Sequence, residues 1–457
     1  MDYSAFGKSA ALDKRRNGIR FLANSVLATA LMPYVAPIPW HKMNVQWFGT
    51  AVAIFAVTAL VLCAPRYISW RRSDTIIILL GVVELVYLRF SYFPVSAEQW
   101  LRACGTIILG FPVYYAVRNL YQYMSPRVFL FVVAIYLSVL VFELISFSAY
   151  ESIFSHFLSE IRRDALVNRG PNGLCNEASM MGDISVLLAL SIYFFHPEHW
   201  RQDKRQKWCV LIACGLMLAI SQSGTGFALA FGLLCLAILT SRKSWWKGII
   251  GLGVLSMALL FLGRVVFANS ESRGARLVSA VAEDPRVALE DPSVAERLFG
   301  IYVAGYSLPR VPLGTGRILL DTHLASEAWY APSMAALWPE DELREFVWYV
   351  RMSQDTGASV ANMIQRMGLV GLMVIVILLS FVRGIRGTIV VQVFLLALML
   401  NASLFISTFW YVIGSCIALQ DQVQSDCDES NRAAAKFRGA SWSARLRDIL
   451  VRPIHGE

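Results

Sequence analysis

Residues 127–147 read RVFLFVVAIYLSVLVFELISF, an apolar stretch long enough to cross the hydrocarbon core of a bilayer as a helix. The whole chain has the same character, because 56% of its 457 residues are hydrophobic and 16% are charged. Soluble proteins have roughly 45–50% and about 25%. The mean hydropathy is +0.53. This composition argues against a cytosolic enzyme, a disordered chain and a secreted disulfide scaffold, and it favours a protein embedded in lipid.

Similar apolar segments recur along the chain and predict an all-α, polytopic membrane helix bundle of about twelve transmembrane helices. The predicted spans cover 21–38, 46–64, 74–92, 101–118, 127–147, 177–195, 208–222, 224–240, 247–267, 360–382, 388–402 and 404–420. The last two segments could also form one long helix. A turn near residues 401–403 would make them a short hairpin.

Lysine and arginine in the short loops predict the orientation, because cytoplasmic loops carry an excess of these residues. Basic residues precede the first span, recur in every second loop and appear again in the C-terminal tail. Both termini are therefore predicted to be cytoplasmic, which requires an even number of spans. That parity favours two spans within residues 388–420.

These spans divide the chain into four parts. Residues 1–267 would hold transmembrane helices 1–9, 268–359 a large extracytoplasmic loop, 360–420 helices 10–12, and 421–457 a basic cytoplasmic tail. We call residues 268–359 the outer segment. A loop of this length is usually functional or forms a small domain. Short helices are predicted in it near 275–283, 293–306 and 340–352.

The outer segment contains many arginines and no lysine, whereas the lysines concentrate in segments predicted to be cytoplasmic. A guanidinium group binds phosphate oxygens in a bidentate way, and an ammonium group only as a point charge. A pyrophosphate at the outer membrane surface would suit such a cluster. The alternative is ordinary salt bridging with the acidic residues of the same segment. The arginines are Arg273, Arg276, Arg286, Arg297, Arg310, Arg317, Arg344 and Arg351.

Residues 169–179 read RGPNGLCNEAS at the point where an outer loop enters the sixth predicted span. Glu177 would lie in the first helical turn, where the helix dipole favours an anion. A carboxylate at the edge of lipid needs a partner, and Arg169 is a candidate. A capped helix with a purely structural salt bridge is the alternative.

Two further stretches contain glycines in turns. SQSGTG at 221–226 separates two short spans, where a tight hairpin is favoured over an anion-binding nest at the next helix start. PRVPLGTG at 309–316 predicts a helix stopped by proline and followed by a glycine turn. It lacks the lysine of a phosphate-binding P-loop, so we do not interpret it as a nucleotide site.

His323 is the only histidine of the outer segment, and Glu327 follows it one helical turn later. It could act as a general base beside that acid, although a solvated loop histidine is the simpler interpretation. The sequence shows no spacing typical of a metal site. We therefore predict no metal and no cofactor.

Taken together, these features resemble the O-antigen ligase and O-antigen polymerase superfamily of bacterial membrane glycosyltransferases. The resemblance covers roughly residues 165–420 and rests on four stretches in order. Two departures matter: Gln222 stands where the family often has arginine, and Gly357 falls where ligases carry a histidine. The four stretches are Arg169 to Ser179, Ser221 to Gly226, Arg297 with Pro312 to Gly316, and Asn362 with Gly368 to Gly371.

The resemblance implies a polymerase of surface or exopolysaccharide repeat units, because the histidine that ligases are thought to use as a base is absent. It would transfer a glycan from a polyprenyl-pyrophosphate carrier to an acceptor sugar hydroxyl at the outer face of the bacterial inner membrane. Arg169 and Arg297 would bind the pyrophosphate, with Arg273 or Arg276 in support. Glu177 would orient an arginine or the acceptor.

The resemblance leaves the base open among Glu177, Asp321 and His323. The implied partners are the lipid-linked glycan, the bilayer and other membrane proteins of polysaccharide assembly, with no nucleic acid. Two other functions stay open: a ligase that moves finished glycan to lipid A core or another acceptor, and a transporter or flippase of the lipid-linked glycan. The transporter is disfavoured, because no internal repeat is visible and the polar residues gather in an outer loop.

Overall fold

The chain is all-helical over the residues that the computed structural model describes. These are 3–35, 46–89, 106–158, 171–175, 178–194, 200, 204–240, 292–316, 322–337, 359–383, 387–401 and 407–425. No strand occurs in these ranges, where the only β-type pairing is an isolated bridge between Val35 and Leu158. The predicted all-α class is therefore confirmed for this part of the chain.

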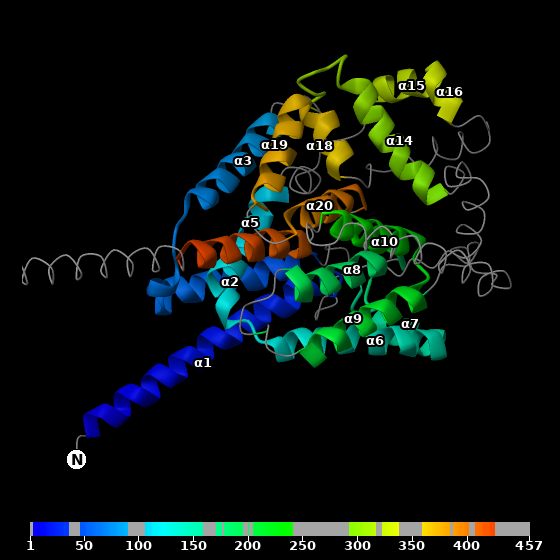
Figure 1. Cartoon of the computed structure of the whole chain (residues 1–457). Helices are drawn as coiled ribbons and strands as arrows, with labels where there is room; N and C mark the ends of the chain where they lie inside the picture. The colour runs from blue at the N-terminus through cyan, green and yellow to red at the C-terminus, as the bar shows by residue number, and fades with distance from the viewer. Residues whose placement is uncertain are drawn as a thin grey trace, which may run out of the picture.

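The helices of the N-terminal half begin and end close to the predicted apolar spans. They are α1 (Tyr3–Leu31), α2 (Gln46–Cys63), η1 (Pro65–Tyr67), α3 (Arg72–Arg89), α5 (Thr106–Leu120), η2 (Tyr121–Tyr123), α6 (Pro126–Ile145), α7 (Phe147–Phe154), α8 (Ala178–Phe194), α9 (Lys204–Ser221) and α10 (Gly224–Leu239). The first helix begins much earlier than the predicted span 21–38. Its polar N-terminal half extends away from the bundle in Figure 1.

The C-terminal half adds α14 (Pro292–Ser307), α15 (Thr322–Tyr330), α16 (Pro332–Leu337), α18 (Ser359–Met367), α19 (Leu369–Ser380), α20 (Thr388–Asn401) and a last helix over 407–425. The predicted turn near 401–403 lies largely outside the described residues and stays a prediction. Residues 360–382 do not form one continuous helix, since Gly368 with φ of 57° separates α18 from α19, while the membrane span itself stays a prediction. The predicted span 247–267, the predicted helices 275–283 and 340–352, and most of the tail lie outside the described residues.

The helices form one bundle with a smaller unit at one end (Figure 1). In the bundle α5 packs on α1, α2 and α3, while α8 packs on α9 and α10. The smaller unit holds α14, α15 and α16 of the outer segment around a separate core. That core is made of Phe299, Val303, Ala325, Ala328, Trp329 and Met334. Helix α14 confirms the predicted helix near 293–306, and it contacts α18 of the bundle.

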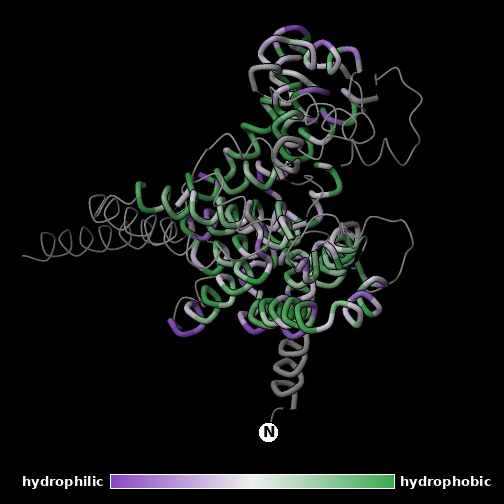
Figure 2. The backbone as a smooth tube through the Cα atoms, turned by 90° about the vertical axis from the view of Figure 1, so that its right-hand side faces the viewer, coloured by the Kyte–Doolittle hydropathy of each residue, from purple (hydrophilic) through white to green (hydrophobic). Residues whose placement is uncertain are grey.

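Helix α3 exposes an apolar face and buries two acids beside the apolar Ile77 and Leu80. Its inward face buries the acids Asp74 and Glu84, which are 0% and 2% exposed. Its outward face is apolar and carries Ile76, Leu79, Val82, Val83 and Val86, all at least 39% exposed. A helix in water shows the opposite arrangement, with apolar residues inside and charged residues outside. Figure 2 shows hydrophobic residues through the bundle and more hydrophilic ones in the smaller unit.

Among the described residues, α6 is the one helix that is both long and apolar enough to cross a membrane. Several other apolar helices are shorter than this criterion requires, including Ala178–Phe194 and Thr388–Leu400. The helical class is thus established for the described residues, while twelve spans stay a prediction.

Candidate functional site

The glycine turn of the outer segment and the break between α18 and α19 form a single joint. Leu369 donates its backbone N–H to the carbonyl of Pro312 at 2.8 Å. In the other direction, Thr315 and Gly316 donate their N–H groups to the carbonyls of Gln365 and Arg366, both at 2.9 Å. Two of the four stretches that carry the family resemblance therefore meet through main-chain hydrogen bonds.

Glycine is required on both sides of this joint. Gly314 and Gly368 have φ of 77° and 57°, in the left-handed region that residues with a Cβ atom rarely adopt. A Cβ on Gly314 would clash with the carbonyl of Arg366, and one on Gly368 would clash with the carbonyl of Pro312. The backbones approach closely only because neither residue has a side chain.

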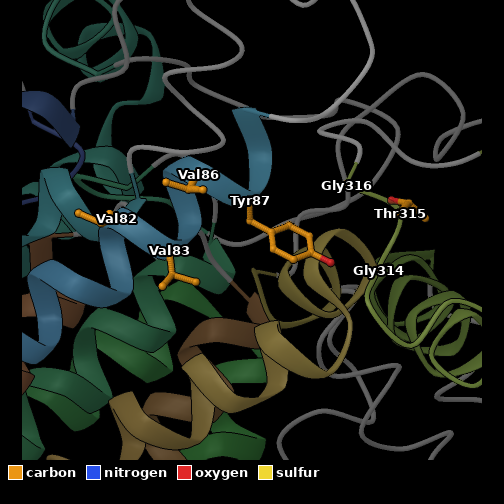
Figure 3. A pocket seen from close by; sticks show the side chains of 7 residues that line it. All are labelled: Val82, Val83, Val86, Tyr87, Gly314, Thr315 and Gly316. Atoms are coloured by element: carbon orange, nitrogen blue, oxygen red, sulfur yellow. The ribbon is translucent and has the colours of Figure 1, made fainter.

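A cavity of about 500 Å³ lies between the joint and helix α3. One wall is made of Val82, Val83, Val86 and Tyr87, and the other of the turn Gly314–Gly316. Figure 3 shows the Tyr87 ring extending from α3 towards this turn. The volume falls within the range of about 300–1,000 Å³ that small-molecule sites occupy. We call this space the α3 cavity.

The turn cannot serve as an anion-binding nest, because its amides are already engaged. Gly314 donates its N–H to the carbonyl of Val311 at 2.8 Å, and the next two amides bond to α18 as described. An anion site at such a turn needs N–H groups that point at the ligand. What the turn can offer are carbonyl oxygens, each with two lone pairs.

Glu84, on the opposite face of α3, holds the cavity wall in place. Its carboxylate accepts hydrogen bonds from the hydroxyl of Thr106 and from the amide of Ile107 at 3.2 Å. These residues begin α5, so Glu84 satisfies an N-terminal amide of that helix and interacts favourably with its dipole. Arg366 of α18 also interacts electrostatically with Glu84. The acid thus connects α3, which forms one wall of the cavity, to the start of α5.

A second buried acid holds part of the predicted loop 169–179. Glu143 of α6 is 2% exposed, and its Oε2 atom accepts the amides of Asn172 and Gly173 at 2.9 and 2.7 Å. The hydroxyl of Tyr150 donates to the carbonyl of Gly173. The start of this loop is therefore attached to α6 and α7, just before α8 begins.

Residues 221–226 form a capped tight turn, as the favoured interpretation of the sequence expected. Gln222 has φ of 48°, and the Ser223 hydroxyl accepts the amide of Gly226 at 3.0 Å to cap α10. Gly182 of α8 lies directly against Ser223 and Gly226, and a Cβ there would overlap both. Small residues permit such close helix approach. The turn 221–226 therefore packs on α8, the helix that follows the stretch 169–179.

Most predicted site residues lie outside the described part of the chain. These are Arg169, Glu177, Arg273, Arg276 and Asp321. The backbone of Arg297 lies in α14, and its side chain is outside the description. The proposed arginine cluster for pyrophosphate therefore stays a prediction.

His323 lies on the exposed face of α15 and forms a pair with Glu327. The side chains are 82% and 43% exposed, and Nδ1 lies 3.2 Å from the carboxylate oxygen. The structure thus agrees with the solvated interpretation of this histidine.

Sequence reasoning missed Glu84, Glu143 and Arg366. The first two are single acids inside apolar runs, IIILLGVVELVYL and FVVAIYLSVLVFELI. An ionisable residue at membrane depth is by default a candidate for a functional or structural polar contact. That signal was present and would have identified both residues.

No family model matches the chain, and no curated protein matches it. Among the described residues, no group of three or more His, Cys, Asp or Glu side chains could hold a metal ion. The geometry of the joint, the α3 cavity and the loop held by Glu143 therefore carries the functional argument.

Replacing Glu143 by leucine should release the loop at 172–173. Two buried amides would lose their acceptor, and an unsatisfied buried group costs about 1–3 kcal/mol. We expect amide exchange at Asn172 and Gly173 to accelerate at least about tenfold, measured by mass spectrometry of the protein in detergent. Glu143→Gln keeps a carbonyl acceptor and should show a smaller effect.

Glu151→Leu provides the control, because this acid is exposed on the neighbouring helix α7. Exchange of the loop amides should stay as in the wild type. Equal exchange in the wild type and in Glu143→Leu would show that the carboxylate does not hold the loop.

Proposed function

We propose that the protein is a membrane polymerase of polysaccharide repeat units, acting at the outer face of a bacterial inner membrane. It takes a glycan from a polyprenyl-pyrophosphate carrier and joins it to a sugar hydroxyl of the acceptor. The four stretches that resemble the ligase and polymerase superfamily are the origin of this proposal. Both termini of the protein would be cytoplasmic, and the outer segment would be extracytoplasmic.

The burial pattern of the helices supports a lipid environment. Helix α3 buries two acids and exposes an unbroken apolar face. Helix α6 likewise buries Glu143 and exposes Phe131, Leu144 and Ile145 at 63%, 62% and 77%. Exposed apolar faces of this extent mark an interaction surface or a membrane. If the chain crosses a membrane about twelve times, the lipid of the bilayer would cover these faces.

The observation that carries the proposal is the direct meeting of two of the resembling stretches, with a third packed beside the helix that follows the fourth. The turn 312–316 is bonded to the backbone around Gly368, and the turn 221–226 packs on α8 directly after the stretch 169–179. Sequence order alone does not require either contact. Stretches that assemble one site are expected to converge in this way, from several helices of a rigid scaffold.

The chemistry requires one bond to form and one to break. The acceptor oxygen attacks the anomeric carbon, its proton passes to a base, and the bond between that carbon and the phosphate oxygen breaks. The electron pair of this bond leaves with the prenyl pyrophosphate. Guanidinium groups that hold the departing charge would act as fixed electrostatic stabilisers, for which Arg169 and Arg297 are the proposed residues. Glu177, Asp321 and His323 are the proposed bases.

A deletion strain separates this function from its alternatives. Loss of a polymerase leaves single repeats on the cell surface, whereas loss of a ligase leaves full-length polymer on the lipid carrier. Loss of a flippase leaves single lipid-linked repeats on the cytoplasmic side. We expect single repeats at the surface, seen by electrophoresis of extracted glycan.

Purified protein offers a second test. In detergent, with lipid-linked repeats and no energy source, it should extend chains. Failure to extend them, together with polymer of normal length in the deletion strain, would eliminate the polymerase.

A further inference from the structure

Two arginines and two tyrosines from three separate segments gather at one end of the bundle. Arg16 lies in α1, Arg66 and Tyr67 form part of η1, and Tyr123 ends η2. The rings of Tyr67 and Tyr123 pack edge to face, with their centroids 5.7 Å apart. Arg66 donates to the Tyr67 hydroxyl at 3.1 Å and lies 5.0 Å from the centroid of the same ring. We call these four residues the basic face.

Both guanidinium groups of the basic face act on Tyr123. Burial raises the pKa of the Tyr123 hydroxyl, and the charges of Arg16 and Arg66 oppose this rise, so both groups lie within electrostatic reach of it. Contacts between α1 and η2 bring Arg16 to this place, although the two arginines are far apart in the sequence. Both arginines are exposed. Like charges held near each other repel, so an anion bound between them would stabilise the arrangement.

The positive charge of the basic face is not neutralised by the acids described near it. Asp74 is bound to Arg118, and Asp421 lies 3.8 Å from Arg71. Among the described residues, no carboxylate forms an ion pair with either arginine of the basic face. The face therefore keeps its charge for a ligand. Guanidinium groups bind phosphate oxygens in a bidentate way, so a phosphate is the anion that it fits best.

We propose that the basic face binds the phosphate of an anionic phospholipid in the leaflet on the side of the termini. This inference goes beyond the proposed polymerase. It rests on the membrane location that belongs to that proposal, and it does not depend on glycosyl transfer. A lipid bound here would hold the ends of α1, α2 and α5 at the level of the headgroups.

The position of the basic face along the helices favours a lipid over a soluble phosphate compound. Its four residues fall directly outside the predicted spans 21–38, 46–64 and 127–147, which is where headgroups lie. Basic residues at this level are attracted to anionic lipids. Tyrosines are enriched there as well, because the ring is apolar and the hydroxyl is polar.

Exposed apolar side chains begin close to the arginines. Phe21 of α1 is 69% exposed, Leu62 of α2 is 76% exposed, and Trp70 after η1 is 57% exposed. A phospholipid has the same order of parts, with a charged phosphate followed by hydrocarbon. Its acyl chains would cover these side chains while its phosphate contacts Arg16 and Arg66, and the removal of both apolar surfaces from water would add to the binding.

The test measures lipid binding without turnover. The full-length protein in detergent is titrated with phosphatidylglycerol, which is anionic, or with phosphatidylcholine, which has no net charge. Native mass spectrometry gives the Kd of the first bound lipid. We expect the wild type to bind phosphatidylglycerol at least about fivefold more tightly than phosphatidylcholine. Arg16→Gln and Arg66→Gln should each raise the Kd for phosphatidylglycerol at least about fivefold, as expected for the loss of one cation beside an anionic headgroup.

Arg383→Gln is the matched control, because Arg383 is likewise an exposed arginine just beyond the end of a helix and lies outside the basic face. Its Kd should stay within about twofold of the wild type. The thermal midpoints of all three variants should agree with that of the wild type, since each replaced side chain is exposed. Equal Kd values in the wild type, Arg16→Gln and Arg66→Gln would overturn the proposal. So would an equal rise in Arg383→Gln, because any surface charge would then serve.

Two competitors separate a lipid from a soluble ligand. Inorganic phosphate and glycerophosphoglycerol, the headgroup without acyl chains, are added at millimolar concentration to the complex with phosphatidylglycerol. Neither should displace the lipid, because neither covers the apolar side chains. Displacement by either compound would assign the basic face to a soluble phosphate compound and overturn the lipid site.

The outcome also separates this inference from the proposed function. A protein that binds phosphatidylglycerol through Arg16 and Arg66 but extends no chain would remove the polymerase and keep the lipid site. A protein that extends chains but binds the lipid equally well in both variants would keep the polymerase and remove the site.

Discussion

Arg169→Lys and Arg297→Lys should each lower chain extension at least about 100-fold, with the protein still inserted in the membrane. Removing one group that stabilises developing negative charge costs about 10²–10³ in rate. Lysine keeps the charge but loses the planar fork that binds two phosphate oxygens at once. The measurement is the rate of extension of lipid-linked repeats by purified variants, with membrane content checked by immunoblot.

Arg310→Lys is the control for these two changes. Arg310 belongs to the same outer segment, but its guanidinium lies 3.5 Å from the Tyr306 ring centroid and donates to the Tyr306 carbonyl at 2.9 Å. A residue occupied in this way should tolerate lysine with little loss of rate. Normal polymer length in both Arg169→Lys and Arg297→Lys would remove the arginines from the mechanism.

Arg118→Met should destabilise the folded bundle by about 3–5 kcal/mol, the usual cost of removing one partner of a buried ion pair. The side chains of Arg118 and Asp74 are 1% and 0% exposed, and Arg118 also donates to the hydroxyl of Ser69 at 3.0 Å. Asp74 further accepts from the Tyr114 hydroxyl at 2.7 Å. Loss of the guanidinium leaves the buried Asp74 carboxylate without a cationic partner. The thermal unfolding midpoint in one detergent measures the effect.

Arg71→Met should change the same midpoint little. Its nitrogen lies 3.8 Å from Asp421, with the two side chains 54% and 32% exposed, and such pairs contribute about 0–1 kcal/mol. The double variant Arg118→Met with Asp74→Leu should recover much of the loss, because both charges are gone. A midpoint for Arg118→Met equal to that of Arg71→Met would show that the buried pair does not stabilise the bundle.

The positions of the helices could be predicted from the sequence, because the start and end of an apolar segment are visible in consecutive residues. The ends of α2, α8, α10 and α20 lie within a few residues of the predicted spans. The division at Gly368 could not be predicted, because a single glycine inside a predicted span does not by itself show that the helix breaks there. Gly368 has a positive φ and lies against the carbonyl of Pro312, which is distant in the sequence, and hydrophobic periodicity does not indicate such a contact.

The candidate site was predictable only in outline. Glycine in 312–316 and 221–226 indicated turns, and the structure contains both. The sequence could not show that the amides of the first turn are bonded to chain carbonyls, which leaves none of them for an anion. Nor could it place Glu84 and Glu143, since a single acid in an apolar run does not identify its partner. Those partners, the amides at 107 and 172–173, come from other helices and loops.

The joint at Gly314 and Gly368 consists of backbone atoms alone, and this has an evolutionary consequence. Carbonyls and amides are the same for every residue type except proline, so the contact survives substitution of nearly all neighbouring side chains. The constrained residues are glycines: Gly314 and Gly368 have no room for a Cβ, and Gly316 has a φ of 65°. Distant descendants of this chain could diverge beyond recognition in the surrounding sequence and still assemble the same joint. They would be recognised by two glycines at the correct separation more readily than by any stretch of similar side chains.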